Sequence, residues 1–171
     1  MADRRTPEER LQPVLLDRLT DDEPEKKLEP REQRVVSKSR MRQAVLRDLA
    51  WLFNATRLEA EAGLAGAPYA RRSVMFFGLP ALSGKTASSL DVSEIERAIR
   101  QSVLDFEPRI LPSTLQVRAL DVDQLEHHNI IGVEIYGHLW AQPVPVELLV
   151  RTEIDLETGE VQIADLASRI K

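Results

Sequence analysis

The sequence contains no cysteine and no long apolar run, and each absence excludes a class of protein. Without cysteine among its 171 residues, the chain can form neither a disulfide framework nor a thiolate metal site, which fits a reducing compartment. No segment approaches the roughly 20 apolar residues of a membrane-spanning helix. The start of the chain, MADRRTPEER, is charged and lacks the apolar centre of a signal peptide. We therefore expect a cytoplasmic protein with no direct membrane insertion.

The charge balance is acidic. The chain carries 23 basic and 28 acidic side chains, which give a formal net charge of −5 and a pI of about 5.3. Such a surface does not attract the nucleic-acid backbone or an anionic membrane. Hydrophobic residues make up 43% of the chain and charged residues 30%, which is typical of a folded globular domain. We expect no nucleic-acid partner.

Two regions differ in composition. Residues 1–36 join a stretch with apolar residues at helical spacing, LQPVLLDRLT, to a highly charged linker that contains two prolines. We interpret them as an N-terminal arm whose short helix either folds back on its own domain or binds a neighbouring protein; the sequence leaves both open. Residues 37–171 are patterned as one domain.

Helical patterns come first in this domain. Apolar side chains recur at helical spacing from about residue 39 to residues 54–58, and again from about residue 93 to residue 105. Two residue pairs fit the reciprocal capping pattern at the start of the second helix: Asp91 with Glu94, and Ser93 with Glu96.

The pattern then changes to the two-residue alternation of β-strands. Four segments show it: TLQVRALDV, NIIGVEIYGHLW, VELLVRTEIDL and EVQIADL. The turn ETG at residues 157–159 joins the last two as a β-hairpin. Helices followed by strands with one covered face predict an α+β fold, with N-terminal helices packed on a mostly antiparallel C-terminal sheet that ends in a hairpin.

The stretch GLPALSGKT, residues 78–86, looks like a phosphate-binding loop. That loop needs four residues between its first glycine and the Gly-Lys pair, so that successive backbone N–H groups surround the phosphates. Gly78 lies one position too early, and Pro80 lacks an N–H group that the loop would use. No helix signal begins at Lys85. We predict a polar turn here and no nucleotide hydrolysis.

No other stretch predicts catalysis. His127 and His128 are adjacent and would point to opposite sides of a strand, and His138 falls in a separate strand. There is no nucleophile elbow, and no two carboxylates are brought to the spacing of a glycosidase. We predict that the protein is not an enzyme, and that it has no catalytic residue, metal site, cofactor or small-molecule substrate.

The segment DFEPRI places Glu107, Pro108 and Arg109 at the break between the second helix and the sheet. Pro108 disfavours helical geometry in the residue before it and stiffens the corner. Arg109 can form bidentate pairs with carboxylates. From these residues alone, the triplet is either an ordinary helix end with surface charges or a corner that binds a partner.

Three stretches together resemble a known family. In their order and at their distances, PVLLDRLTDDEP, VMFFGLPALSG and FEPRI closely resemble TssE, the small baseplate subunit of bacterial type VI secretion systems. TssE is similar to the phage-tail baseplate wedge protein long labelled a lysozyme, whose hallmark is the same Glu-Pro-Arg triplet. The resemblance covers nearly the whole chain. It departs at Phe76 and Phe77, where a more polar pair is expected.

The resemblance implies a structural part rather than an enzyme. Such subunits lie in the cytoplasmic baseplate wedge beside TssF, TssG and TssK, and the contractile sheath starts to polymerise on them. The triplet Glu107, Pro108 and Arg109 is then expected to support assembly by binding partners. A regulator that binds a signalling protein, like the anti-adaptors of similar fold, is the alternative, and a peptidoglycan hydrolase is a third possibility that the missing export signal disfavours.

The resemblance also implies a fold like the part of the sheath subunit that exchanges strands with its neighbours. An open sheet has two edges with unpaired backbone groups. We predict that Val161 and Ile163 on the last strand, or else the strand at residues 113–122, accept a strand from a sheath subunit. On the last strand, we expect the N–H group of Gln162 to face outward.

Overall fold

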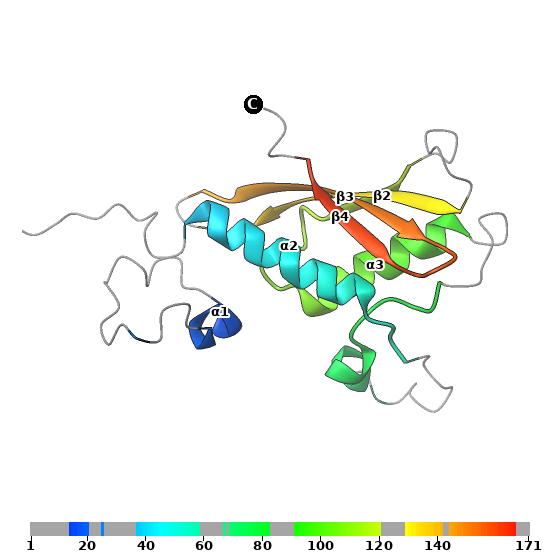
Figure 1. The fold of residues 1–171 in the computed structure, drawn as a ribbon, viewed down its shortest axis with the longest axis horizontal. Coiled ribbons are helices and arrows are strands. Elements are labelled where there is room, and N and C mark those ends of the chain that lie inside the picture. Colours follow the sequence, from blue (N-terminus) through cyan, green and yellow to red (C-terminus); the bar gives the residue numbers. More distant parts are fainter. Residues whose placement is uncertain are drawn as a thin grey trace, which may run out of the picture.

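A computed structural model describes residues 14–20, 25, 37–58, 67, 69–82, 91–120, 129–141 and 144–166 (Figure 1). The elements follow the chain in this order: α1 (Leu15–Leu19), α2 (Lys38–Asn54), the short 3-10 helices η4 (Ala70–Arg72) and η5 (Val74–Phe76), α3 (Val92–Phe106), β1 (Gln116–Ala119), β2 (Ile130–Leu139), β3 (Val146–Asp155) and β4 (Val161–Asp165). The helices precede the strands, which confirms the predicted α+β fold.

The strands form one antiparallel sheet in which each strand pairs with the next along the chain. The spatial order is β1-β2-β3-β4, so β1 and β4 are its edges. The predicted hairpin joins β3 to β4, and Gly159 takes the positive φ of 77° that its turn requires. Asp155 Oδ1 accepts the N–H groups of Glu157 and Thr158 at 2.7 and 3.1 Å and closes the turn.

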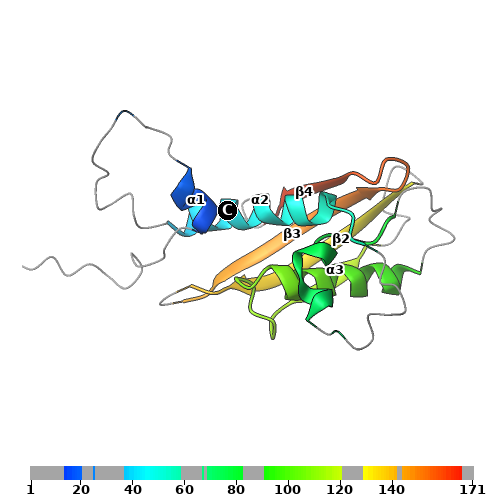
Figure 2. The same cartoon turned by 90° about the horizontal axis from the view of Figure 1, so that it is seen from below.

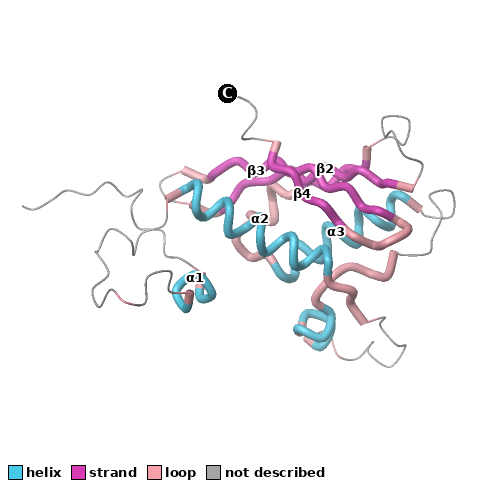
Figure 3. Tube along the Cα trace, in the orientation of Figure 1, coloured by secondary structure: helices cyan, strands magenta, loops and turns pink. Residues whose placement is uncertain are grey.

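Both long helices lie on one face of the sheet (Figures 1 and 2). In the tube view they form a layer separate from the strands (Figure 3). The two-residue alternation explains this arrangement, because the odd-numbered residues of β2 from Ile131 to Leu139 are buried beneath the helices, whereas Glu134, Tyr136 and His138 on the other face are half-buried. α2 contacts β4, and α3 contacts β1.

The helix α2 begins at a serine cap and buries one stripe of apolar residues. The Oγ of Ser37 accepts the N–H of Arg40 at 3.1 Å. The buried residues are Met41, Ala44, Val45, Leu49, Leu52 and Phe53. Since Val45 and Leu49 are completely buried, each contributes about 1.5–3 kcal/mol of transfer free energy to the packing of helix on sheet. None of the described helices is long and apolar enough to cross a membrane.

The start of α3 uses only part of the predicted capping. The carboxylate of Asp91 accepts the N–H of Ser93 at 2.9 Å, and bonds from the side chain and backbone of Ser93 hold the pKa of Asp91 below its ordinary value. The pairing predicted for Ser93 with Glu96 is wrong. Glu96 instead accepts the backbone N–H of Ala119 on β1 at 2.7 Å, because the sheet packs closely enough to offer an unpaired donor.

Gly78 seats the loop after η5 against the end of α2. Its φ is +121°, and a Cβ there would lie 2.2 Å from the backbone oxygen of Ala55, so only glycine fits. The N–H of Leu79 donates to the same oxygen at 2.9 Å, and the buried Oγ of Ser102 on α3 donates to the oxygen of Gly78 at 3.1 Å. The resemblance to a phosphate loop thus begins at a glycine that serves packing. Gly84 and Lys85 lie outside the described residues.

Candidate functional site

The Glu-Pro-Arg triplet forms the tight turn that leads from α3 into the sheet. The N–H of Glu107 still donates to Val103 at 2.9 Å, and the N–H of Ile110 donates to the oxygen of Glu107 at 3.2 Å. The oxygen of Arg109 then accepts the N–H of Trp140, just beyond β2, at 2.7 Å. Pro108 is exposed at the tip of the turn. The turn is therefore anchored at both ends by backbone bonds, with its proline facing solvent.

The carboxylate of Glu107 is buried and paired with Arg109. Only 3% of the Glu107 side chain is exposed. Its Oε1 accepts the backbone N–H of Arg109 at 3.1 Å and Nε at 2.6 Å, and its Oε2 accepts from Nη2. Burial alone would lower the pKa of Arg109, but the bonds to Glu107 and Asp48 outweigh it and hold that pKa above its ordinary value. The pair is a bidentate ion pair, the strongest geometry available to these side chains.

Asp48 on α2 links this pair to the N-terminal helix. Its Oδ2 accepts from Nη2 of Arg109 at 2.6 Å, and its Oδ1 accepts from Nε of Arg47 at 3.0 Å. Arg47 also lies over the ring of Trp51, 5.2 Å from its centroid, and donates to Asp17 of α1 at 2.5 Å. Charges of alternating sign thus run from α1 to the triplet. The leucines of α1, Leu15, Leu16 and Leu19, are exposed.

The geometry leaves a small surface for a partner at the triplet. The charges of Glu107 and Arg109 are directed at each other and at Asp48, but Pro108 is exposed, and so is 55% of Trp140. Within the described part of the chain, Nη1 of Arg109 is buried without a hydrogen-bond partner. We call Pro108, Arg109 and Trp140 the triplet surface. Sequence reasoning found neither Trp140 nor Asp48, because no pattern relates them to a motif so far away along the chain.

At the β4 edge, the register decides which backbone groups face outward. The N–H of Asp155 donates to Glu160, and that of Leu166 donates to Leu149. Because such bonds recur at every second residue of an antiparallel pair, the even-numbered residues of β4 bond to β3 and the odd-numbered ones face outward. Val161 and Ile163 therefore present their backbone groups at the edge. The expectation for Gln162 is wrong, because its N–H faces β3.

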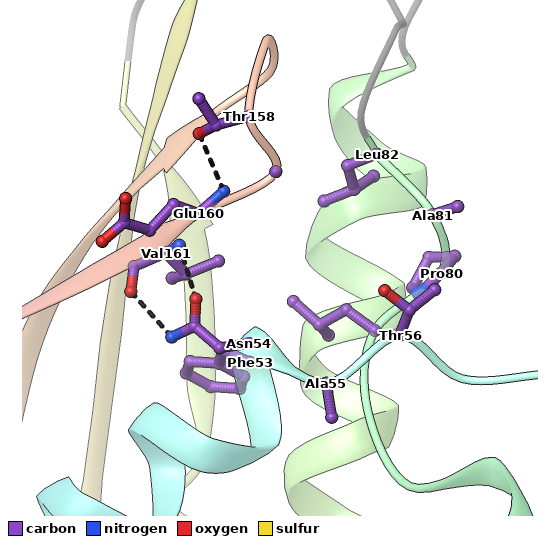
Figure 4. Close-up of a pocket in the computed structure, with 12 residues that line it drawn as sticks. Phe53, Asn54, Ala55, Thr56, Pro80, Ala81, Leu82, Thr158, Glu160 and Val161 are labelled. Carbon is purple, nitrogen blue, oxygen red and sulfur yellow. Dashed lines mark hydrogen bonds between the residues drawn. The ribbon is translucent and has the colours of Figure 1, made fainter.

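Asn54, the last residue of α2, already occupies the outward groups of Val161 (Figure 4). Its Oδ1 accepts the N–H of Val161 at 2.9 Å, and its Nδ2 donates to the oxygen of Val161 at 2.9 Å. No hydrogen bond from the described residues reaches the outward groups of Ile163.

The β1 edge is occupied in a similar way. The N–H of Leu120 donates to Gly132 on β2 at 2.8 Å, so Val117 and Ala119 face outward. The N–H of Ala119 is the group that Glu96 accepts. The strand predicted at residues 113–122 is shorter in the structure, at Gln116–Ala119.

Among the described residues, no hydrogen bond or ion pair joins the triplet to Val161 or Ile163, the other predicted partner region. Instead α2 contacts both regions, the first through Asp48 and the second through Asn54. Whether either region binds a partner stays a prediction.

A pocket of about 370 Å³ opens beside Asn54 (Figure 4). It is lined by the end of α2, the loop at 79–82 and the turn before β4, and Glu160 is the one titratable residue among the described residues that line it. Catalysis by one carboxylate as acid and another as base needs two such groups, and the described lining supplies one. Among the described residues no group of three potential metal ligands gathers.

The histidines and the pair Phe76 and Phe77 were singled out in the sequence, and His138 and both phenylalanines lie within the described residues. His138 lies half-buried on the open face of the sheet, where its ring meets that of Tyr136 edge-on at 5.5 Å. His127 and His128 lie outside the described residues. Phe77, one of the two residues that depart from the family pattern, packs edge-on against Phe106 at 5.3 Å, next to the triplet.

The chain was compared with protein-family models, curated proteins and solved structures. The family model described as Baseplate wedge protein gp25 matches residues 39–144. The matched region spans α2, the Gly78 loop, α3, the triplet and the first two strands, and it ends before β3. No curated protein and no solved structure matches the chain.

Proposed function

Because the chain belongs to the family of Baseplate wedge protein gp25, we propose that it is the subunit of a type VI secretion baseplate that connects the wedge to the contractile sheath and nucleates the sheath. The observation that carries the proposal is the family match over residues 39–144, a region that holds the whole triplet. That match supports a structural role in a phage-tail-like baseplate. The finer assignment to type VI secretion, in the cytoplasm, rests on the resemblance to TssE.

The triplet surface is the contact that we assign to the wedge proteins TssF, TssG or TssK. An anchored turn loses little conformational entropy on binding, so contacts to it are efficient. Tryptophan and arginine are the side chains that most often dominate the binding energy of an interface. The side chain of Trp140 is exposed, and its backbone N–H binds the backbone oxygen of Arg109.

A pair of tryptophan variants tests this contact. Trp140 and Trp51 are exposed to almost the same degree, 55% and 53%, but Trp51 lies on α2 over Arg47. We expect Trp140→Ala to remove the wedge subunits from co-purification, and Trp51→Ala, as the matched control, to retain them. Both should melt close to the wild-type temperature. Equal recovery of the wedge subunits with the two variants would contradict the assignment.

For the sheath contact, we propose addition of a strand at one of the two edges. The outward backbone groups of Ile163 on β4 and of Val117 on β1 are the ones that a visiting strand would need. The same addition would require Asn54 to leave Val161 at the β4 edge, and Glu96 to leave Ala119 at the β1 edge. The last two strands lie outside the region that the family model matches. The proposal for the β4 edge is therefore supported by the geometry of that edge and not by the family match.

Proline substitution distinguishes the two edges. Ile163→Pro and Val117→Pro each remove one outward N–H without removing a bond of the native sheet. One of them should stop sheath assembly while wedge subunits still co-purify. Gln162→Pro is the control for damage to the fold, because it removes an N–H that faces β3. If sheaths form normally with both outward variants, strand addition is wrong.

A further inference from the structure

The side chain of Asn54 takes the place of a strand residue. In a hydrogen-bonded antiparallel pair, two residues exchange both N–H···O bonds. Asn54 exchanges the same two bonds with Val161, each 2.9 Å long. The second hydrogen of Nδ2 binds the oxygen of Ala50 at 2.8 Å, which fixes the orientation of the amide. A primary amide thus occupies the position where the backbone of a fifth strand would bond.

At the β1 edge, the carboxylate of Glu96 occupies the position of a visiting strand through one hydrogen bond and its negative charge. Its Oε1 accepts the N–H of Ala119 at 2.7 Å. A carboxylate accepts hydrogen bonds and donates none. A strand arriving at Ala119 would bring a carbonyl oxygen to the same N–H, and the carboxylate would exclude and repel it. Charged side chains at sheet edges are a known means of preventing strands from pairing.

Both edges would otherwise suit pairing with another chain. The outward positions of β4 are Val161, Ile163 and Asp165, and those of β1 are Val117 and Ala119. Neither strand contains a proline. Since Asn54 occupies the outward groups of Val161 and Glu96 occupies the outward N–H of Ala119, a visiting strand loses bonds at both edges.

We propose that Asn54 and Glu96 guard the two edges against a second copy of this chain. Each guard comes from the helix that packs beneath its own edge, α2 under β4 and α3 under β1. The guards keep the isolated subunit from pairing edge to edge. This inference concerns the free protein and does not depend on the baseplate role.

The test measures self-association of the purified protein. Mass is determined by size-exclusion chromatography with light scattering over a concentration series, for the wild type and for Asn54→Ala combined with Glu96→Ala. We expect the double variant to self-associate on the order of tenfold more tightly. At concentrations where the double variant is still monomeric, hydrogen exchange at Val161 and Ala119 should be faster than in the wild type, since both amides lose their acceptors. Unchanged exchange at both amides of that monomer would overturn the proposal.

Two further variants separate edge pairing from general destabilisation. Ser102→Ala removes a buried hydrogen bond to Gly78, away from both edges, and should keep the wild-type mass. Adding Ile163→Pro and Val117→Pro to the double variant should restore the wild-type mass, because proline blocks the outward positions. A folded double variant with the same mass as Ser102→Ala at every concentration overturns the proposal. So does self-association that the two prolines leave unchanged.

Discussion

Replacing Arg109 with alanine would leave the buried carboxylate of Glu107 without its ionic partner. Breaking a buried ion pair by removing one member typically costs about 3–5 kcal/mol. We expect a loss at the lower end of this energy range, because the backbone N–H of residue 109 would still donate to Glu107. The bond from Arg109 to Asp48 adds little, at most about 1 kcal/mol, since 26% of the Asp48 side chain is exposed. We expect a loss of about 3 kcal/mol.

Thermal unfolding measures this loss directly. For a chain of this size, 1 kcal/mol corresponds to a shift of roughly 2–4 °C in melting temperature, so Arg109→Ala should melt roughly 6–12 °C below the wild type. The double variant Glu107→Gln with Arg109→Met removes both charges at similar volume and should recover much of the loss, because neutral replacement of a buried pair is often tolerated. A melting temperature for Arg109→Ala within about 2 °C of the wild type would refute the reasoning.

Three further predictions follow from other contacts. Gly78→Ala should lower the free energy of unfolding by more than the roughly 1–3 kcal/mol of strained backbone alone, because its Cβ would overlap the oxygen of Ala55. Gly137→Ala should lower it far less, because its Cβ would lie 3.2 Å from a side-chain methyl group. Urea unfolding of the two variants measures both losses. The backbone N–H groups of Thr158 and Glu157 hold the pKa of Asp155 below its ordinary value, so its ionised carboxylate stabilises the fold, and this contribution is complete above that ordinary value. The stability difference between the wild type and Asp155→Asn should therefore vanish as the pH falls through the folded-state pKa, and a difference that persists there would contradict this assignment. Finally, ATP with Mg²⁺ should not change the melting temperature, although saturation at 100 times a dissociation constant would add about 2.7 kcal/mol; a reproducible shift would reopen the enzymatic interpretation.

The sequence predicted the two main helices and the last three strands closely, because apolar spacing is a local property; it did not predict the 3-10 helix at Ala70–Arg72, and it made the first strand too long. The second main helix was expected at residues 93–105 and spans Val92–Phe106. The alternation in the strands identified the buried face of β2 and β3. Neighbouring strands then paired in chain order, as short connections favour.

The contacts that define the site are not local, and the sequence could not supply them. Asp48 and Arg109 are 61 positions apart, and Asn54 and Val161 are 107 apart. Alternation shows which face a side chain occupies, but not which neighbour the backbone N–H faces. That depends on the register between two strands, and for this reason the expectation for Gln162 was wrong.

In the proposed function, this chain is a structural part of a baseplate on which a sheath assembles. The most direct test is fluorescence imaging of labelled sheath in cells from which this chain has been deleted. We predict that sheaths are absent without the chain and return when the wild-type protein is supplied. Sheaths of normal number and length in the deletion strain would contradict the account.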